Sequence, residues 1–320
     1  MKKQLMRWAA AVSVVLVLTV EAAAAPRMLI PGGSTVGIKL DTQGVIVTGF
    51  AENSSAQRAG IEKGDVIVEV DGAEVHTAAA LQENLDRASV VLTVLRNGKE
   101  AQFCVTPNQT ADGARLGAYV RDSIAGIGTV TYYDPNTGAF GALGHGVNDA
   151  ETSILMPLES GVVIRSAVSK VEPGAVGRPG ELKGVFDVRE ILGEVDSNTS
   201  YGIFGHLTVP VSGQPLPVAS PEEAETGPAE ILANVSGDTV RRYDVEIERI
   251  FSEDGGTGRN LLVHITDPDL LAQTAGIVQG MSGSPIIQNG KLLGAVTHVL
   301  VNDPSRGYGI FLETMLDAAA

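Results

Sequence analysis

The sequence has little of several residue types, and each shortage excludes a class of protein. A single cysteine, Cys104, excludes an intrachain disulfide framework and a zinc site built from cysteines. Lysine and arginine number 23 against 38 acidic residues, which gives a formal charge of −15. Because nucleic acids and anionic membranes bind basic surfaces, neither is expected to be the main partner. No cluster of metal-ligating residues is visible, so the sequence predicts no metal and no cofactor.

Turn-forming residues, in contrast, are abundant. The chain contains 38 glycines and 15 prolines, whereas aromatic residues make up only 4% of it, a mixture that favours many tight turns and a mostly-β fold. The 44% apolar content is typical of a folded globular protein, and 320 residues suggest two domains. Short strand-like runs alternate with turns over residues 113–320, which predicts a barrel or sandwich. Helical periodicity appears there only at residues 312–318.

The N-terminus has the pattern of an export signal. Lys2, Lys3 and Arg7 precede an uncharged apolar run at residues 8–20, and four alanines follow at residues 22–25. A basic start, a short apolar run and a small-residue exit are typical of a signal peptide. The run is short for a membrane-spanning helix, although it could be retained as an anchor. Residues 1–25 are therefore predicted to be a signal peptide or membrane anchor, and the rest of the chain to be exported.

Residues 26–108 read as one small module. A strand-like run at residues 65–70 ends in an Asp-Gly turn, a helix is predicted over residues 77–87 with Thr77 as its cap, and Asn97-Gly98 marks a hairpin. The segment SAQRAGIEKGDVI, residues 55–67, resembles the PDZ family closely.

That resemblance implies that the module binds a peptide as an added strand, with loop N–H groups receiving the peptide's terminal carboxylate. The loop here lacks the usual pair of glycines. A PDZ fold that serves only as a brace or regulator is the alternative interpretation. The peptide-binding residues expected from the resemblance are Val36, Gly37, Ile38 and Lys39.

The segment QGMSGSP, residues 279–285, is the strongest catalytic motif. A nucleophilic serine needs an exposed hydroxyl on a tight turn, and the glycines on either side of Ser282 permit such a turn. The amides of Gly280 and Ser282 could then stabilise an oxyanion during acyl transfer. The pattern resembles the surroundings of the serine in chymotrypsin-like proteases. A simple Gly/Ser turn between strands is the alternative interpretation.

A serine nucleophile requires a base, and His145 is the best candidate among five histidines. It lies in the turn GALGHG, residues 141–146, near the start of the second domain, where its flanking glycines leave the ring accessible. The order of base first and serine last is that of chymotrypsin. The remaining histidines are His76, His206, His264 and His298.

The residue that orients the base should be a carboxylate. Asp267, in the turn Thr-Asp-Pro, lies 15 residues before Ser282. Aspartate before proline is also an ordinary turn former, and the spacing does not choose among the candidates. The competing residues are Asp149, Asp187, Asp254 and Asp269.

Together, the export segment, the PDZ module, the GALGHG turn and the segment GMSGSPIIQNGKLLGAVTHVLVNDPSRGYGIF resemble the SpoIVB-type S55 serine peptidases of endospore-forming Firmicutes. The resemblance extends from Arg27 to Met315. It implies a chymotrypsin-like double β-barrel over residues 113–320, with Ser282, His145 and Asp267 as catalytic residues.

The same resemblance implies a physiological role. Such an enzyme is exported from the forespore into the space between its two membranes and releases itself by self-cleavage near its N-terminus. It then cuts a membrane-bound inhibitor of an intramembrane protease, which triggers activation of a sigma factor. The expected partners are therefore protein substrates, including the chain itself, and the oligomeric state stays open. A catalytically inactive PDZ scaffold is the alternative. A quality-control protease is disfavoured because its PDZ module would follow the protease domain.

Overall fold

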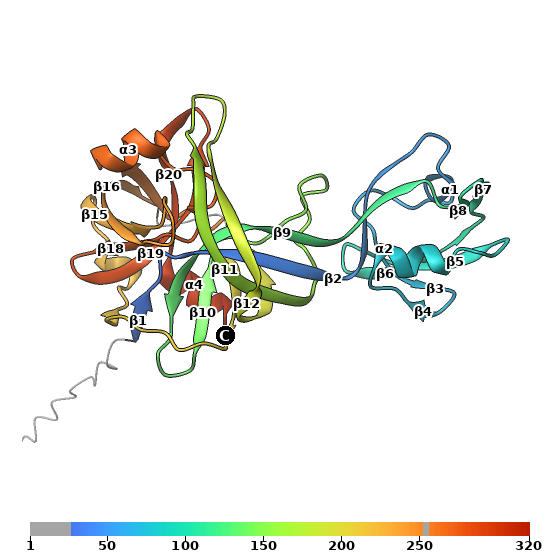
Figure 1. Cartoon of the computed structure of the whole chain (residues 1–320), viewed down its shortest axis with the longest axis horizontal. Coiled ribbons are helices and arrows are strands. Elements are labelled where there is room, and N and C mark those ends of the chain that lie inside the picture. Colours follow the sequence, from blue (N-terminus) through green and yellow to red (C-terminus); the bar gives the residue numbers. More distant parts are fainter. Residues whose placement is uncertain (1–26, 252–255) are drawn as a thin grey trace, which may run out of the picture.

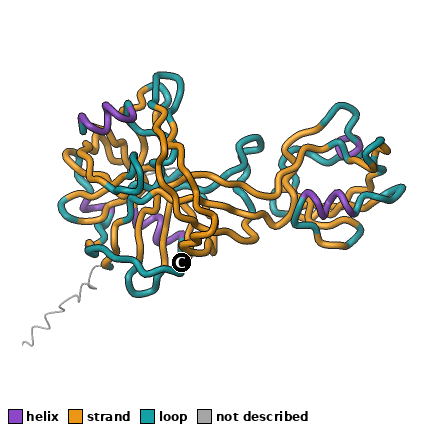
Figure 2. Tube along the Cα trace, in the orientation of Figure 1, coloured by secondary structure: helices purple, strands orange, loops and turns teal. Residues whose placement is uncertain are grey.

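The computed structural model describes residues 27–251 and 256–320 and consists of a large and a small lobe (Figure 1). Two long strands, β2 (Thr35–Phe50) and β9 (Ala118–Tyr133), run side by side from one lobe to the other. They form an antiparallel ladder from Thr35 opposite Thr129 to Phe50 opposite Ala118. Most of the chain is strand and loop (Figure 2), which confirms the predicted mostly-β class.

The small lobe contains the elements predicted for the PDZ module. The Asn97-Gly98 hairpin is confirmed, and both residues have positive φ, +52° and +74°, as a tight hairpin turn requires. Thr77 caps the predicted helix, accepting a hydrogen bond from the N–H of Ala80, but the helix is shorter than predicted. The elements are α1 (Ser55–Arg58), β3 (Val66–Val70), β4 (Ala73–Glu74), α2 (Ala78–Glu83), β5 (Val90–Arg96), β6 (Lys99–Val105), β7 (Asn108–Thr110) and β8 (Gly113–Arg115).

The large lobe contains two β-barrels, as predicted. In the first, the strand order β9-β10-β13-β12-β11-β2 closes on itself because β2 also pairs with β9. Short strands β1 and β14 extend it beyond β9. The remaining strands are β1 (Met28–Pro31), β10 (Ala139–Ala142), β11 (Leu158–Glu172), β12 (Glu181–Thr199), β13 (Gly202–Leu207) and β14 (Leu216–Pro217).

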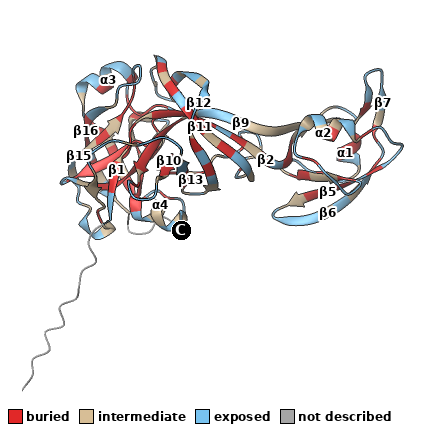
Figure 3. Ribbon diagram, turned by 60° about the horizontal axis from the view of Figure 1, so that its bottom comes forward, coloured by how far each residue is buried: buried red, intermediate tan, exposed pale blue. Residues whose placement is uncertain are grey.

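The second barrel is closed in the order β15-β16-β17-β20-β19-β18. Buried residues fill the interior of both barrels (Figure 3), and the second has the larger apolar core. The C-terminal helix lies where the sequence predicts it. The elements are η1 (Pro221–Glu223), β15 (Gly227–Ala233), β16 (Arg241–Ile250), β17 (Leu261–Ile265), α3 (Pro268–Thr274), β18 (Pro285–Gln288), β19 (Lys291–Leu300), β20 (Asp303–Phe311) and α4 (Leu312–Ala318).

The small lobe does not begin and end where the sequence predicts. The predicted module of residues 26–108 includes Val36 and Ile38, which are buried in the core of the first barrel. Ala114 and Leu116, beyond its predicted end, are buried in the core of the small lobe. The small lobe is therefore inserted between β2 and β9, and the first barrel uses chain from both sides of the insertion.

Two predictions about the chain's attachment and chemistry fall outside the described residues. These are the export signal at residues 1–25 and the candidate carboxylate Asp254. Within residues 27–251 and 256–320, no helix has the length and apolar composition needed to cross a membrane.

Candidate active site

Ser282 lies in a tight loop between Gly280 and Gly283, immediately before strand β18. Both glycines have a left-handed backbone, with φ of +99° and +98°, which residues with a Cβ rarely adopt. A Cβ at Gly283 would lie 2.0 Å from the carbonyl oxygen of Thr129. Glycine is therefore needed for the loop to approach β9 as closely as it does.

Both barrels hold this loop. From the first barrel, Thr129 donates through its hydroxyl to the Gly280 carbonyl, 2.7 Å, and through its N–H to the Ser282 carbonyl, 3.0 Å. From the second, the Val296 carbonyl accepts from the N–H of Gly283, 2.7 Å. The N–H groups of Gly280 and Ser282, the predicted oxyanion donors, make none of the hydrogen bonds found among the described residues, and so both are available to a ligand.

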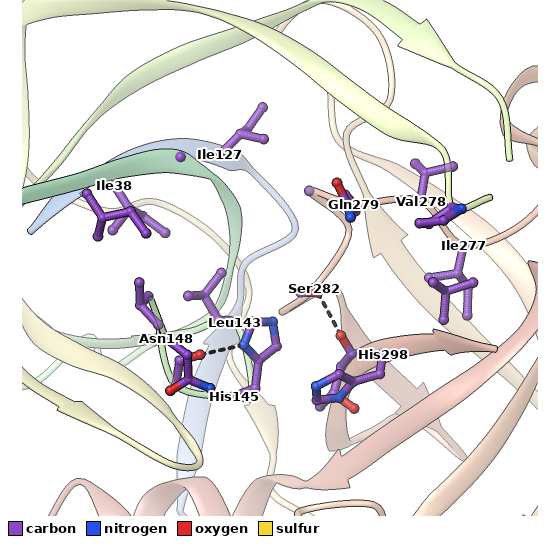
Figure 4. Close-up of a pocket in the computed structure, with 18 of the residues that line it drawn as sticks. Ile38, Ile127, Leu143, His145, Asn148, Ile277, Val278, Gln279, Ser282 and His298 are labelled. Atoms are coloured by element: carbon purple, nitrogen blue, oxygen red, sulfur yellow. Dashed lines mark hydrogen bonds between the residues drawn. The ribbon is translucent and has the colours of Figure 1, made fainter. Parts of the chain in front are cut away.

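His145 follows strand β10 in a turn where Leu143 and Gly144 both have positive φ, +72° and +69°. Its Nδ1 lies 2.9 Å from the carbonyl oxygen of Gly146. Because a carbonyl can only accept, Nδ1 carries the proton and Nε2 is left as a free acceptor. That second nitrogen faces Ser282 (Figure 4). The ring thus presents to Ser282 the tautomer that a general base requires.

His145 and Ser282 line one cavity of about 500 Å³ between the two barrels. The Ser282 hydroxyl donates to the Thr297 carbonyl, 2.7 Å, so it must rotate before it can donate to His145. Apart from His145, His298 and a few polar groups, the residues that line the cavity are apolar. The apolar lining residues are Ile38, Ile124, Ala125, Ile127, Leu143, Val147, Pro179, Ile277, Val278, Val299 and Val301.

The structure does not bring Asp267 to this cavity. Its carboxylate caps the N-terminus of helix α3, accepting from the N–H groups of Asp269 and Leu270 at 2.9 Å each. It also accepts a longer hydrogen bond from the N–H of Asp244. The prediction of Asp267 as the partner of His145 is thus not supported by this arrangement. The Gly146 carbonyl holds Nδ1 instead.

The other candidate carboxylates are also used elsewhere. Asp149 is buried and accepts from the loop N–H groups around Thr152, with Arg121 at 3.3 Å from its second oxygen. Asp187 pairs with Arg189 on the surface, and Asp269 lies in the first turn of α3. Among the described residues, none of the side chains that line the cavity is acidic.

His298 lines the cavity, a role that sequence reasoning did not assign to it. Its ring centroid lies 5.0 Å from that of His145, and its Nδ1 is buried without a hydrogen-bond partner among the described residues. Burial, with smaller effects from His145 and Arg259, lowers the pKa of His298 to about 4. A neutral ring therefore stands beside that of His145. The other three histidines pair with carboxylates outside the cavity: His76 with Glu159, His206 with Asp196, and His264 with Glu248.

The predicted peptide-binding loop is wrong, because it is part of a barrel strand. Residues 36–39 lie in β2 and pair with β9 on one side and with β11 on the other. Both edges are therefore occupied, and the apolar side chains face the barrel core. The residues affected are Val36, Gly37, Ile38 and Lys39.

A groove suited to a peptide lies instead between helix α2 and the start of β9. It has a volume of about 390 Å³, and its floor is mostly apolar, including Leu81, Leu85 and Val120. Its charged lining residues are Glu52 and Arg115. Leu116 and Gly117 connect the end of β8 at Arg115 to the start of β9 at Ala118, and Gly117 has a φ of +71°. One wall of the groove of this PDZ module is thus formed by β9, the strand that follows the module in sequence.

Comparison with known families decides the class. The model of the family "SpoIVB peptidase S55" matches residues 112–316, and the model of the PDZ domain matches residues 33–106. The chain belongs to the SpoIVB peptidase S55 family. It is accordingly a serine peptidase with a PDZ domain, and its peptidase part contains the two β-barrels described above.

Individual relatives of this S55 peptidase are more distant. A "Probable periplasmic serine endoprotease DegP-like" of Halomonas elongata is 35% identical over 77 residues, which are 23% of this chain and 16% of that protein. The chain thus matches only about a sixth of that relative's length. The solved Rv3671c protease, inactive form, is 16% identical over 61% of this chain and 84% of its own, with a TM-score of 0.36. The HtrA-type protease AlgW with decapeptide is 9% identical over 66% and 54%, also at 0.36.

The environment of His145 predicts the pH dependence of this S55 peptidase. Burial lowers the pKa of His145 below its usual 6.5, and the hydrogen bond to Gly146 offsets this only in part. A general base works when neutral, so activity rises with pH through that pKa. We expect the acid limb of kcat/KM against pH to have its midpoint below 6.5. A midpoint above 7 would contradict the role given to His145.

Proposed function

We propose that this chain is an exported, self-cleaving regulatory serine endopeptidase. The observation that carries the proposal is the shared cavity in which Nε2 of His145 faces the glycine-flanked Ser282. After rotation of its hydroxyl, Ser282 would transfer its proton to His145 as Oγ attacks a peptide carbonyl. The Gly280 and Ser282 amides would stabilise the oxyanion, and His145 would return the proton to the leaving amine.

The proposed regulatory role is the one known for the family. In that role the enzyme cuts a membrane-bound inhibitor of an intramembrane protease in the space between forespore and mother cell, and so leads to sigma-factor activation. The basic and apolar start at residues 1–20 supports export, and so does the matched segment of a periplasmic relative. The PDZ groove supports selection of a protein substrate by a peptide segment.

Self-cleavage is tested by sequencing the N-terminus of the purified wild-type protein and of Ser282→Ala. We expect the wild type to acquire a new N-terminus downstream of residue 25 on incubation, and Ser282→Ala to retain its original one. Ser169→Ala, which removes an exposed hydroxyl on β11, serves as the matched control and should cleave like the wild type. Trimming of pure Ser282→Ala at the same site would contradict the proposal.

A further inference from the structure

Strand β9 has one unpaired edge along most of its length. One edge pairs with β2 from Ala118 to Thr129. The pairings of β9 with β1 and β10 involve only residues from Val130 onward. No described strand pairs with the other edge between Ala118 and Gly128. An unpaired edge presents free N–H and C=O groups that can pair with an added strand.

The register shows which backbone groups face this open edge. Thr129 donates its N–H to Ser282 and accepts at its C=O from Leu143, so both groups turn away from β2. Alternate residues of an antiparallel strand turn these groups to the same edge, and the ladder with β2 is regular from Thr129 to Ser123. Ile127 and Ala125 therefore also turn their N–H and C=O groups to the open edge. Both residues line the catalytic cavity.

At its other end, the open edge starts in the PDZ groove. The carbonyls of Leu116 and Gly117 accept hydrogen bonds from the N–H groups of Ala56 and Ala51, at 3.0 and 2.8 Å. The N–H of a trans peptide unit points opposite to its C=O. The N–H groups of Gly117 and Ala118 therefore point away from Ala56 and from Ala51, the residue that follows β2. Two neighbouring N–H groups that point the same way are suited to an anion.

The charge of the groove favours a terminal carboxylate. Arg115 lines the groove two residues before Gly117, and within the described residues no carboxylate or carbonyl is bonded to its guanidinium. A guanidinium and two free amides together bind a carboxylate more strongly than they bind a neutral internal peptide group. The chemistry at this end of the edge thus selects the free C-terminus of a peptide.

We propose that one substrate strand occupies the whole open edge, with its C-terminal carboxylate at Gly117–Ala118 and its scissile bond at Ser282. A strand anchored there and extended along β9 is antiparallel to it, so its upstream part reaches the loop of Ser282, which ends the open edge at Thr129. The edge from Ala118 to Gly128 holds eleven residues, or about 36 Å. The pairing of β9 with β2 is irregular between Ser123 and Arg121 and again between Val120 and Tyr119, so an added strand gains or loses a residue or two along the edge. The enzyme should therefore cut about 9 to 12 residues before a C-terminus. This inference rests on Ser282 being the nucleophile, as proposed above.

The test uses the full chain and two synthetic libraries of random 20-residue peptides, one ending in a free carboxylate and the other in an amide. Mass spectrometry of the products gives the distance of each cut from the C-terminus. With free carboxylates we expect the cuts to cluster at about 9 to 12 residues from the end. With amides we expect the cluster to disappear and the total rate to fall about tenfold, because the charge-assisted contact is lost.

Variants separate anchoring from chemistry. Arg115→Ala should disperse the cuts made in the free-acid library, while labelling of the enzyme by a fluorophosphonate stays as in the wild type. Arg87→Ala, an exposed arginine that pairs with Asp71 outside the groove, is the control and should keep the cluster. Cuts at the same positions in both libraries, or scattered in both, would overturn the inference and leave the peptidase assignment intact. Failure to cut either library together with no labelling of Ser282 would overturn both.

Discussion

Replacement of Ser282 by alanine is expected to lower kcat/KM for peptide hydrolysis by about 10⁴- to 10⁶-fold. The alanine has no oxygen that can attack the carbonyl, and His145 then has no proton to receive. The fold should persist, because the loop is held by backbone groups and by Thr129 and loses only the hydrogen bond from Ser282 to the Thr297 carbonyl. Binding in the PDZ groove should be unchanged, since Ser282 does not line it.

The measurement is a kinetic assay on a peptide that the wild type cleaves, combined with urea unfolding of both proteins. Ser169→Ala is again the control for loss of a hydroxyl outside the cavity. A variant that keeps more than about one hundredth of wild-type activity, without contamination by another protease, would contradict the role of Ser282 as nucleophile.

Replacement of Gly283 by alanine is expected to have the largest effect on stability. The new Cβ would lie 2.0 Å from the Thr129 carbonyl oxygen and 2.6 Å from the Leu143 nitrogen, at a φ of +98°. Both contacts are with backbone, so neither can be relieved by rotation of a side chain. Forced separation of the loop from β9 would also break the hydrogen bond between Thr129 and Ser282. We expect a loss of about 4 kcal/mol in the free energy of unfolding, and loss of activity.

Gly290→Ala provides a matched control for this effect. Gly290 also has a positive φ, +75°, but nothing lies within 4 Å of the Cβ that alanine would add. Its cost should therefore be only that of the left-handed backbone, about 1 kcal/mol. Urea unfolding of both variants measures the difference. Equal destabilisation of the two would show that the close approach of the loop to β9 contributes nothing.

The tight turns that hold Ser282 and His145 could be predicted because short motifs specify them. Glycines directly beside each residue specify the turn, and a turn depends on neighbours in the sequence. The N–H groups that surround Ser282 follow from the same local geometry. The packing of the two barrels brings Ser282 and His145 into one cavity. This packing depends on the whole fold, and the short motifs do not specify it.

The partner of His145 could not be predicted in the same way. The assignment of Asp267 rests on the family resemblance, whereas the sequence Asp-Pro-Asp followed by apolar residues is also a typical start of a helix. In the structure Asp267 caps a helix: its carboxylate accepts hydrogen bonds from the N–H groups of Asp269 and Leu270 at the start of α3. His298 was missed because a histidine in the strand sequence AVTHV has no local feature that tells which face it occupies.

The location of the peptide groove also depended on information that the sequence does not show. Residues 35–50 form one uninterrupted strand that belongs to the barrel at one end and to the small lobe at the other. Buried apolar residues occur on both sides of that division, so the sequence does not show where one lobe ends and the other begins. The groove's edge strand lies after the rest of the module, at Ala118–Val120, within the stretch that the sequence assigns to the second domain.

The assignment of Ser282 as nucleophile and His145 as base is tested by reaction of the folded wild-type chain with a fluorophosphonate, followed by peptide mapping of the adduct. We expect a single adduct, on Ser282. Its rate of formation should rise with pH with a midpoint below 6.5 and should fall sharply when His145 is replaced by alanine. A folded protein that forms no adduct, or forms it on another serine, would contradict the assignment of the site and favour the catalytically inactive PDZ scaffold.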